Sequence, residues 1–126
     1  MYTYPEKNGK AGFVYDGVWF NNKRHGHGTM RFTDGREYEG RWKNGLKHGK
    51  GFELRKDGTT YEGLWKMGKK HGKGKLQSKE GDVYDGLWAD DQKNGHGVET
   101  LKSGLKYTGE WVNNKKQGHG LQKWRN

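Results

Sequence analysis

The stretch Tyr38–Gly51, YEGRWKNGLKHGKG, decides the fold of this chain. Tyr38, Gly40 and Trp42 are spaced two residues apart, so in a β-strand all three face the same side. A glycine between two rings weakens a strand by itself, and its presence indicates that a neighbouring ring or backbone approaches closely. After a polar segment, the pair formed by Gly49 and Gly51 opens a second strand. The stretch therefore predicts a β-hairpin.

The same pattern recurs along the chain at an unbroken interval of 23 residues. The repeated tyrosines are Tyr15, Tyr38, Tyr61, Tyr84 and Tyr107, and the tryptophans four residues later are Trp19, Trp42, Trp65, Trp88 and Trp111. Each copy also has a glycine two residues after its tyrosine, then a Gly-x-Gly pair, and the four full copies end with the turn glycines Gly35, Gly58, Gly81 and Gly104. Five copies in register without an insertion identify a repeat protein.

The composition fits a thin, elongated molecule. Only 28% of the 126 residues are hydrophobic and 32% are charged, yet the chain has six Trp, seven Tyr and four Phe, so its apolar surface is concentrated in a few large rings. A single hairpin is marginal in water, whereas stacked hairpins bury one continuous aromatic stripe. We therefore expect an all-β fold, an elongated twisted ribbon of stacked antiparallel β-hairpins that advances roughly 10 Å per repeat.

The repeat boundaries follow from the tyrosines. Residues 1–14 are expected to form a partial repeat, with Tyr2 and Tyr4 in its second strand and a long turn over Glu6–Lys10. Five repeats follow, over 15–37, 38–60, 61–83, 84–106 and 107–120, and residues 121–126 are expected to form an incomplete strand. Because open sheet edges pair readily, we expect a homodimer through the ends as one form of association.

The turns and the second strands are less regular in sequence. Polar segments predict hairpin loops over Asn21–His25, Leu46–His48 and Gly68–His71. Asp34-Gly35 and Asp57-Gly58 predict tight turns, with weaker versions at Glu80-Gly81 and Ser103-Gly104. Apolar residues of the second strand change phase, from Met30 and Phe32 in the first copy to Phe52 and Leu54 in the second and Leu76 alone in the third. We therefore expect the first strand to supply most of the core.

The pattern Tyr-Glu-Gly-x-Trp followed by Gly-x-Gly resembles the membrane occupation and recognition nexus (MORN) repeat, over residues 15–120 almost completely. The glycine in the middle of the loop is present at Gly45 and Gly68 and is replaced elsewhere by Asn22, Asp91 and Asn114. The resemblance implies a β-hairpin ribbon. It also implies roles in protein–protein scaffolding, dimerisation and phospholipid binding, near membranes or the cytoskeleton.

The aromatic stripe has two interpretations. One is a buried interior, because a repeat must bury something. The other is a groove that stays open for a partner helix or extended peptide, since large exposed aromatic patches mark interfaces. For the second we select the rings of the middle repeats, whose burial in the monomer would exclude it: Tyr38, Trp42, Tyr61, Trp65, Tyr84 and Trp88.

A column of positive charges predicts a second surface. The ninth residue after each repeated tyrosine is always basic, namely Arg24, Lys47, Lys70, Lys93 and Lys116. Stacking is expected to align these cations along the loop edge, where five could contribute roughly 5 kcal/mol at most against an anionic membrane. An acidic column, Asp16, Glu39, Glu62 and Asp85, opposes it. The basic column therefore has two interpretations. One is acidic phospholipid binding, which is the alternative function, and the other is a solvated edge that binds no ligand.

The remaining patterns give no indication of a metal site, a cofactor site or a catalytic site. The histidines recur in loop-like slots, and no carboxylate accompanies them at a fixed spacing, so we expect no metal site and no cofactor. The two serines, Ser78 and Ser103, lie outside any site-like context, so we expect no catalytic residues and no enzyme. The formal charge of +10 favours anionic partners, but the rings occupy structural positions, which disfavours nucleic acid. The chain contains no cysteine and no membrane-spanning apolar run, so we expect a cytoplasmic location.

Overall fold

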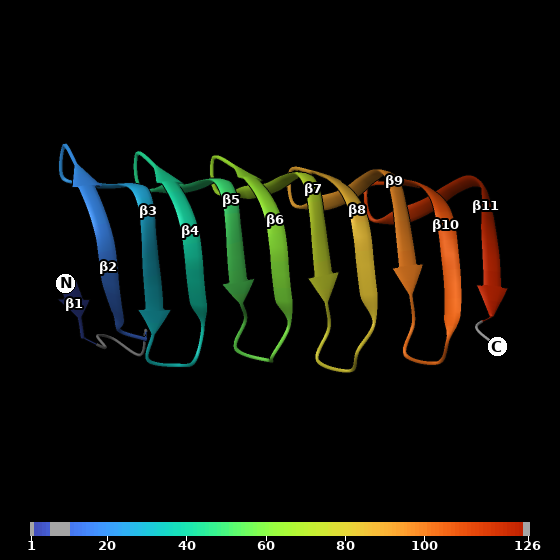
Figure 1. The fold of residues 1–126 in the computed structure, drawn as a ribbon, viewed down its shortest axis with the longest axis horizontal. Helices are drawn as coiled ribbons and strands as arrows, with labels where there is room; N and C mark the ends of the chain where they lie inside the picture. Colours follow the sequence, from blue (N-terminus) through green and yellow to red (C-terminus); the bar gives the residue numbers. More distant parts are fainter. Residues whose placement is uncertain (1, 6–10, 125–126) are drawn as a thin grey trace.

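The computed structural model describes residues 2–5 and 11–124, which form one eleven-stranded antiparallel sheet in chain order (Figure 1). These residues contain no helix, so the predicted all-β ribbon of stacked hairpins is confirmed. The strands are β1 (Tyr2–Tyr4), β2 (Phe13–Phe20), β3 (Lys23–Phe32), β4 (Glu37–Lys43), β5 (Leu46–Leu54), β6 (Thr60–Lys66), β7 (Lys69–Gln77), β8 (Val83–Ala89), β9 (Gln92–Thr100), β10 (Leu105–Val112) and β11 (Lys115–Trp124).

Each repeat joins its two strands by a two-residue turn in which both residues have φ between 48° and 88°. This is the left-handed geometry of a type I′ turn, which matches the twist of the flanking strands. The turns are Asn21-Asn22, Asn44-Gly45, Met67-Gly68, Asp90-Asp91 and Asn113-Asn114. The longer loops predicted over Asn21–His25, Leu46–His48 and Gly68–His71 are therefore wrong, because a two-residue turn returns the chain to the sheet at once and the residues after it are strand.

The connections between repeats are tight turns, as predicted, including those at Glu80-Gly81 and Ser103-Gly104. Their glycines have φ between 95° and 102°. In the second connection the backbone N–H of Gly58 donates to the carbonyl of Arg55 over 3.0 Å, and that of Thr59 donates to Asp57 Oδ1 over 2.9 Å.

Every repeat bends just after or at the glycine of its first strand. In the second repeat Gly40 pairs with Gly51 and Trp42 pairs with Lys47, so Arg41 alone opposes residues 48–50 of β5. The first, third and fourth repeats shift at the same place, whereas in the fifth the shift comes one residue earlier, where Gly109 alone opposes residues 118–120 of β11. Extra residues on one strand bend it and increase its twist. Figure 1 shows the result: the strand ends nearest the two-residue turns curl back from the rest of the sheet.

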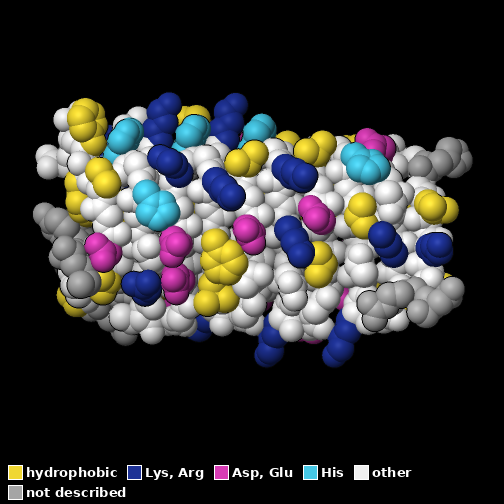
Figure 2. Space-filling view, in the orientation of Figure 1, with side chains coloured by type: hydrophobic (Ala, Val, Ile, Leu, Met, Phe, Trp, Pro, Cys, Tyr) yellow, Lys and Arg dark blue, Asp and Glu magenta, His cyan; other side chains and the backbone are white. Residues whose placement is uncertain are grey.

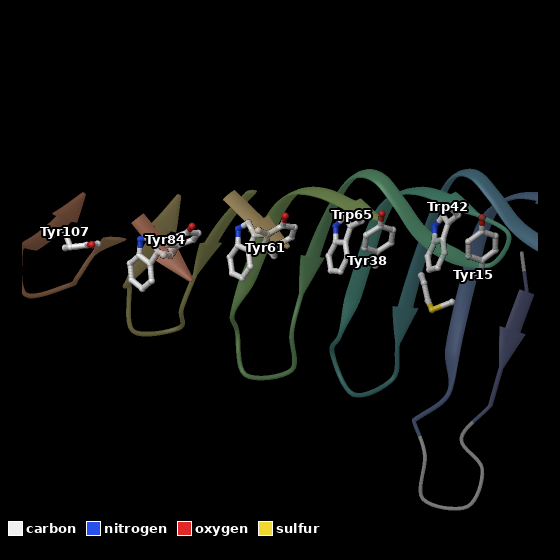
Figure 3. Packing of buried hydrophobic residues seen from close by; sticks show 10 residues of the cluster. Tyr15, Tyr38, Trp42, Tyr61, Trp65, Tyr84 and Tyr107 are labelled. Carbon is white, nitrogen blue, oxygen red and sulfur yellow. The ribbon is translucent and has the colours of Figure 1, made fainter. Parts of the chain in front are cut away.

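The core lies inside this bend. The tyrosines and tryptophans of the five repeats are at most 5% exposed, except the partly buried Trp19. Their rings meet edge to face, with centroids 4.9–5.5 Å apart within a repeat and 5.3–5.8 Å apart between a tyrosine and the next repeat's tryptophan (Figure 3). Of the buried core residues described, only Met30 belongs to a second strand, so the first strand does supply most of the core.

The glycines make room for the tyrosine rings. A Cβ on Gly51 would overlap the ring of Tyr38, and a Cβ on Gly40 would lie 2.5 Å from the Cα of Gly51. Each second strand also keeps the same register, because Tyr15 pairs with Met30, Tyr38 with Glu53 and Tyr61 with Leu76. The phase change in the second strand is thus a change of residue type at one inner position, and Phe52 lies on the outer face, 40% exposed.

The two ends of the sheet are β1 and β11. Tyr2 and Tyr4 lie in β1 and pair with Tyr15 and Phe13, in agreement with the expected strand, whereas the turn predicted over Glu6–Lys10 lies outside the described residues. At the other end, residues 121–124 continue β11 without a break, and residues 125–126 of the predicted last strand lie outside the described residues.

Candidate interaction surface

The rings selected for an open groove are all buried. Exposed fractions are 1%, 0% and 2% for Tyr38, Tyr61 and Tyr84, and 5% for each partner tryptophan, Trp42, Trp65 and Trp88. The open aromatic groove is therefore wrong for this chain by itself. The physical reason is the bend, which folds each ring between the rings of its neighbours and the glycine backbone.

The polar atoms of these rings are buried inside the fold, and all but Trp65 Nε1 have a hydrogen-bond partner there. Each repeated tyrosine donates its hydroxyl proton to the carbonyl three residues on, over 2.8–3.3 Å. Burial raises the pKa of the Tyr38 and Tyr61 hydroxyls, and raises that of Tyr84 to about 12. Trp42 and Trp88 donate their Nε1 protons to the carbonyls of Gly28 and Gly74 over 3.1 Å. These contacts hold the interior together and are not presented to a partner.

The basic column lies on the inner face, not on a loop edge. Each of its cations pairs across the hairpin with the tryptophan of its own repeat. In the first four repeats its charged end then rests on the tyrosine of that repeat and the tryptophan of the next: Lys47 Nζ is 5.2 Å from the Tyr38 centroid and 4.7 Å from that of Trp65. Lys116, in the last repeat, rests on Tyr107 and Trp111 of its own repeat. The predicted loop-edge position of Arg24, Lys47, Lys70, Lys93 and Lys116 is therefore wrong, because the turns are shorter than expected and the cations cover the rings.

Carboxylates balance part of this column. Glu53 and Glu99 occupy the inner position of the second strand, 3.0 Å from Lys47 and 3.4 Å from Lys116 respectively. Lys70 is 7% exposed, and burial lowers the pKa of its ammonium group although Asp91 lies 3.8 Å away. The column thus belongs mainly to the packing of the fold.

The opposite, outer face carries two parallel rows of exposed side chains. The acidic column noticed in the sequence forms one row, in which Glu39 and Glu62 flank Phe52 and Asp85 pairs with Lys75. The second row lies two residues further along each strand and is mainly basic. It consists of His27, Arg41, Lys50, Leu64, Lys73, Leu87 and His96. Figure 2 shows this face, where over the left and centre of the view a band of Lys, Arg and His side chains lies above the acidic ones.

Between the two rows runs a trough. Its floor is glycine backbone, including Gly40 and Gly51 in the second repeat. Two hollows of about 390 and 240 Å³ make it up, and they share Lys50 and Glu62 as lining residues. One wall is mainly basic and the other mainly acidic, with Lys75 between Glu62 and Asp85 in the acidic wall. Both walls contain apolar side chains: Phe52 is 40% and Leu64 41% exposed. This glycine-floored trough is the hollowed part of the outer face.

The sequence analysis missed the basic wall. At this position the first strands of the five repeats carry Val18, Arg41, Leu64, Leu87 and Glu110, so no residue type repeats every 23 residues. The wall emerges only when β3 is placed beside β4 and β5 beside β6, which pairs His27 with Arg41 and Lys50 with Leu64. The basic wall could have been predicted from the sequence only with the correct strand register, including the shift at the bend.

The histidines and serines have local partners. His48 Nδ1 accepts the backbone N–H of Met67 over 3.2 Å, and His96 Nδ1 lies 3.0 Å from Glu110 Oε2. Ser78 Oγ accepts the backbone N–H of Asp82 over 3.1 Å. Over residues 2–5 and 11–124, no three His, Asp or Glu side chains group in a way that could hold a metal ion.

Comparison with known families supports the repeat assignment. The MORN repeat model matches the chain five times, over residues 15–35, 38–60, 61–83, 84–106 and 107–126. The chain belongs to the MORN repeat family. MORN repeats are in general non-catalytic modules associated with membrane and protein binding. No curated protein matches this MORN array. Within its described residues, no helix has the length and hydrophobicity needed to cross a bilayer.

Proposed function

We propose that this MORN array is a non-catalytic scaffold that binds partner proteins through the trough on its outer face. The observation that carries the proposal is the pairing of a basic and an acidic wall across one continuous glycine floor. Arg41, Lys50 and Lys73 stand on one side, and Glu39 and Glu62 on the other. Exposed Phe52 and Leu64 add apolar contact area, which interfaces use at their centres.

The charge arrangement favours a protein over a polyphosphate. A nucleic acid carries negative charge along its whole length, so the acidic wall would repel it beside the basic wall. A polypeptide can present both signs within a few residues and satisfy both walls at once. The trough is also preformed, because its floor is built into the sheet. Binding therefore does not require the scaffold to be ordered first.

A charge-matched pair of variants tests this function. The wall variant carries Leu64→Glu and Lys73→Glu, and the control carries Lys79→Glu and Ser103→Glu at exposed turn positions. A photoreactive phenylalanine analogue at position 52 cross-links bound proteins. We expect a defined set of cross-linked proteins with the parent chain and the control, and loss of that set with the wall variant. Equal capture by all three would show that the trough is not the binding surface.

A second candidate function is contact with an anionic membrane surface through the two-residue turns. Large apolar side chains are exposed beside four of the five turns: Phe20 58%, Leu46 45%, Met67 65% and Val112 44%. Exposed lysines flank the same turns, namely Lys23, Lys43, Lys66, Lys69 and Lys115. Apolar and basic side chains together are what interfacial membrane binding uses. This edge takes the place of the buried cation column as the lipid-facing surface.

Flotation with vesicles containing phosphatidylserine tests the second candidate. We expect binding by the parent chain that falls steeply with salt, because each exposed lysine contributes about 1 kcal/mol near an anionic surface. Met67→Ser with Lys66→Gln and Lys69→Gln should abolish flotation. Lys50→Gln with Lys73→Gln, on the outer face, should leave it intact. If the Met67 variant and the outer-face variant reduce flotation equally, the turn edge is not the membrane-binding surface.

A further inference from the structure

We infer that the trough takes an extended polyproline-II segment that carries a basic residue at every third position. The inference rests on the proposed function, that the outer face binds protein, and it names the conformation and charge pattern of the partner. Three observations support it: the width of the trough, the pairing of its glycine backbone within the sheet, and the spacing of the charged side chains along its walls.

The trough is too narrow for a helix. Its walls come from residues two apart on the same strand, such as Glu39 and Arg41, which places them about 7 Å apart. An α-helix with its side chains is about 10–12 Å across, so it would rest on the walls without reaching the floor. An extended chain is thin enough to lie between the walls and contact the glycine backbone.

The floor excludes pairing by strand addition. Gly40 pairs with Gly51, and Gly63 with Gly74, within the sheet, so this backbone lies between strands already paired on both sides. An added β-strand requires an open sheet edge. A polyproline-II segment has no internal hydrogen bonds and leaves its backbone solvated, so it requires none from the floor.

The acidic wall sets the period. Glu39, Glu62 and Asp85 lie on β4, β6 and β8, two strands apart, which separates neighbouring carboxylates by about 9.6 Å. Phe52 and Lys75 occupy the wall positions between them. One polyproline-II turn of three residues advances about 9.3 Å, so across all three carboxylates the mismatch stays below about 1 Å. In a partner that is a β-strand, residues on one side recur about every 6.6–6.8 Å. Such a partner could match the first and last of the three carboxylates but not the middle one.

The basic wall sets the other side chains of the partner. Lys50 and Lys73 line the trough from β5 and β7, two strands apart, with Leu64 of β6 between them, and Arg41 lines it from β4. Lys50 and Lys73 are therefore also about 9.6 Å apart, and they are staggered by one strand from the carboxylates. A second column of the partner, also of period three, therefore carries Asp or Glu. The third column is apolar, with proline the residue that favours this conformation. The repeating unit that fits is Lys-Glu-Pro, and about seven residues span from β4 to β8.

Fluorescence anisotropy with labelled peptides tests the inference on the full chain. The probe is a nine-residue peptide of three Lys-Glu-Pro units. One control has the same composition without the period of three, and a second is a longer helical peptide with Lys at heptad spacing. We expect the periodic peptide to bind at least tenfold more tightly than either control. Glu62→Lys should weaken it at least fivefold, and replacing the central Lys of the peptide by Glu should restore binding to that variant.

Each other outcome overturns the inference. Equal affinity for the permuted peptide means that the period does not matter, and tighter binding of the helical peptide assigns the surface to a helix. If no peptide binds while cross-linking from position 52 still captures proteins that the wall variant loses, the partner is not of this class and the proposed function stands. If the cross-linking fails as well, both fall.

Discussion

Tyr38 and Gly51 show at the scale of single residues why the repeat keeps both an aromatic ring and a glycine. The ring fills the space that a side chain at Gly51 would occupy, and its hydroxyl donates to the carbonyl of Arg41 over 2.8 Å. Neither residue can change size alone, because β4 and β5 cannot move apart to make room: Gly40 of β4 pairs directly with Gly51 of β5. The glycines of this family pattern are therefore part of the core packing.

Gly51→Ala should destabilise the chain by about 3 kcal/mol, since an added methyl group in a filled core forces side chains and backbone apart. Gly118→Ala is the control: it has φ +71 and no atom within 4 Å of the added carbon, so it should cost about 1 kcal/mol for backbone strain alone. Urea unfolding followed by circular dichroism measures both. Similar losses for the two variants would mean that the overlap with Tyr38 is relieved cheaply.

The two-residue turns offer a stabilising substitution. Asp91 and Asn114 each accept the backbone N–H of the column lysine of the preceding repeat over 2.8 Å. Gly45, at the same place with φ +83, has no side chain to do so, and no atom lies within 4 Å of its added Cβ. Gly45→Asn should therefore add a hydrogen bond to Arg24 N and restrict the unfolded chain, raising stability by about 0.5–1 kcal/mol. A lower melting temperature would contradict this.

At the scale of the elements, the first strand was predictable and the second was not. Tyr, Gly and Trp alternate in all five copies, so the buried side of the first strand follows from the sequence. The inner position of the second strand holds Met30, Glu53 and Leu76 in successive repeats, and no single pattern marks it. Met67-Gly68 and Asp90-Asp91 also lack the usual hairpin-turn sequences. The two-residue turns and the bend, and hence the face on which the cations lie, therefore could not be predicted from the sequence.

The two central lysines of the column should respond oppositely to removal of their charge. Lys47 lies 3.0 Å from Glu53, and although burial favours the neutral acid, Lys47 lowers the pKa of that carboxyl. Lys47→Met leaves Glu53 without this partner and should cost about 2 kcal/mol. Lys70 is more deeply buried and its acidic neighbour Asp91 is more exposed, so Lys70→Met should gain about 1 kcal/mol. Urea unfolding measures the stability of both variants. An equal loss of stability in the two would contradict the predicted difference between Lys47 and Lys70.

At the scale of the whole molecule, the array is held together by contacts between neighbouring repeats. Each described strand pairs with the strands before and after it, and each tyrosine of the first four repeats touches the tryptophan of its own repeat and that of the next. Stability in such a molecule is close to a sum of repeat and interface terms. The outer trough inherits this construction, because every repeat adds one segment to each wall, and a straight, regular partner segment can then meet equivalent positions in turn.

Trp65→Ala should divide the array. Trp65 contacts the rings of Tyr38 and Tyr61 at 5.7 and 5.1 Å, so its loss removes contacts on both sides of the central interface and should cost about 4 kcal/mol. Because the repeats on either side keep their own interfaces, unfolding should separate into two transitions, and amide exchange should accelerate in β6 and β7 more than in β9 and β10. Leu64→Ala is the matched control on the same strand, since Leu64 is exposed on the outer face and its removal should leave one transition. A single cooperative transition in the tryptophan variant, with exchange raised uniformly, would show that the chain behaves as one unit and not as an array of coupled neighbours.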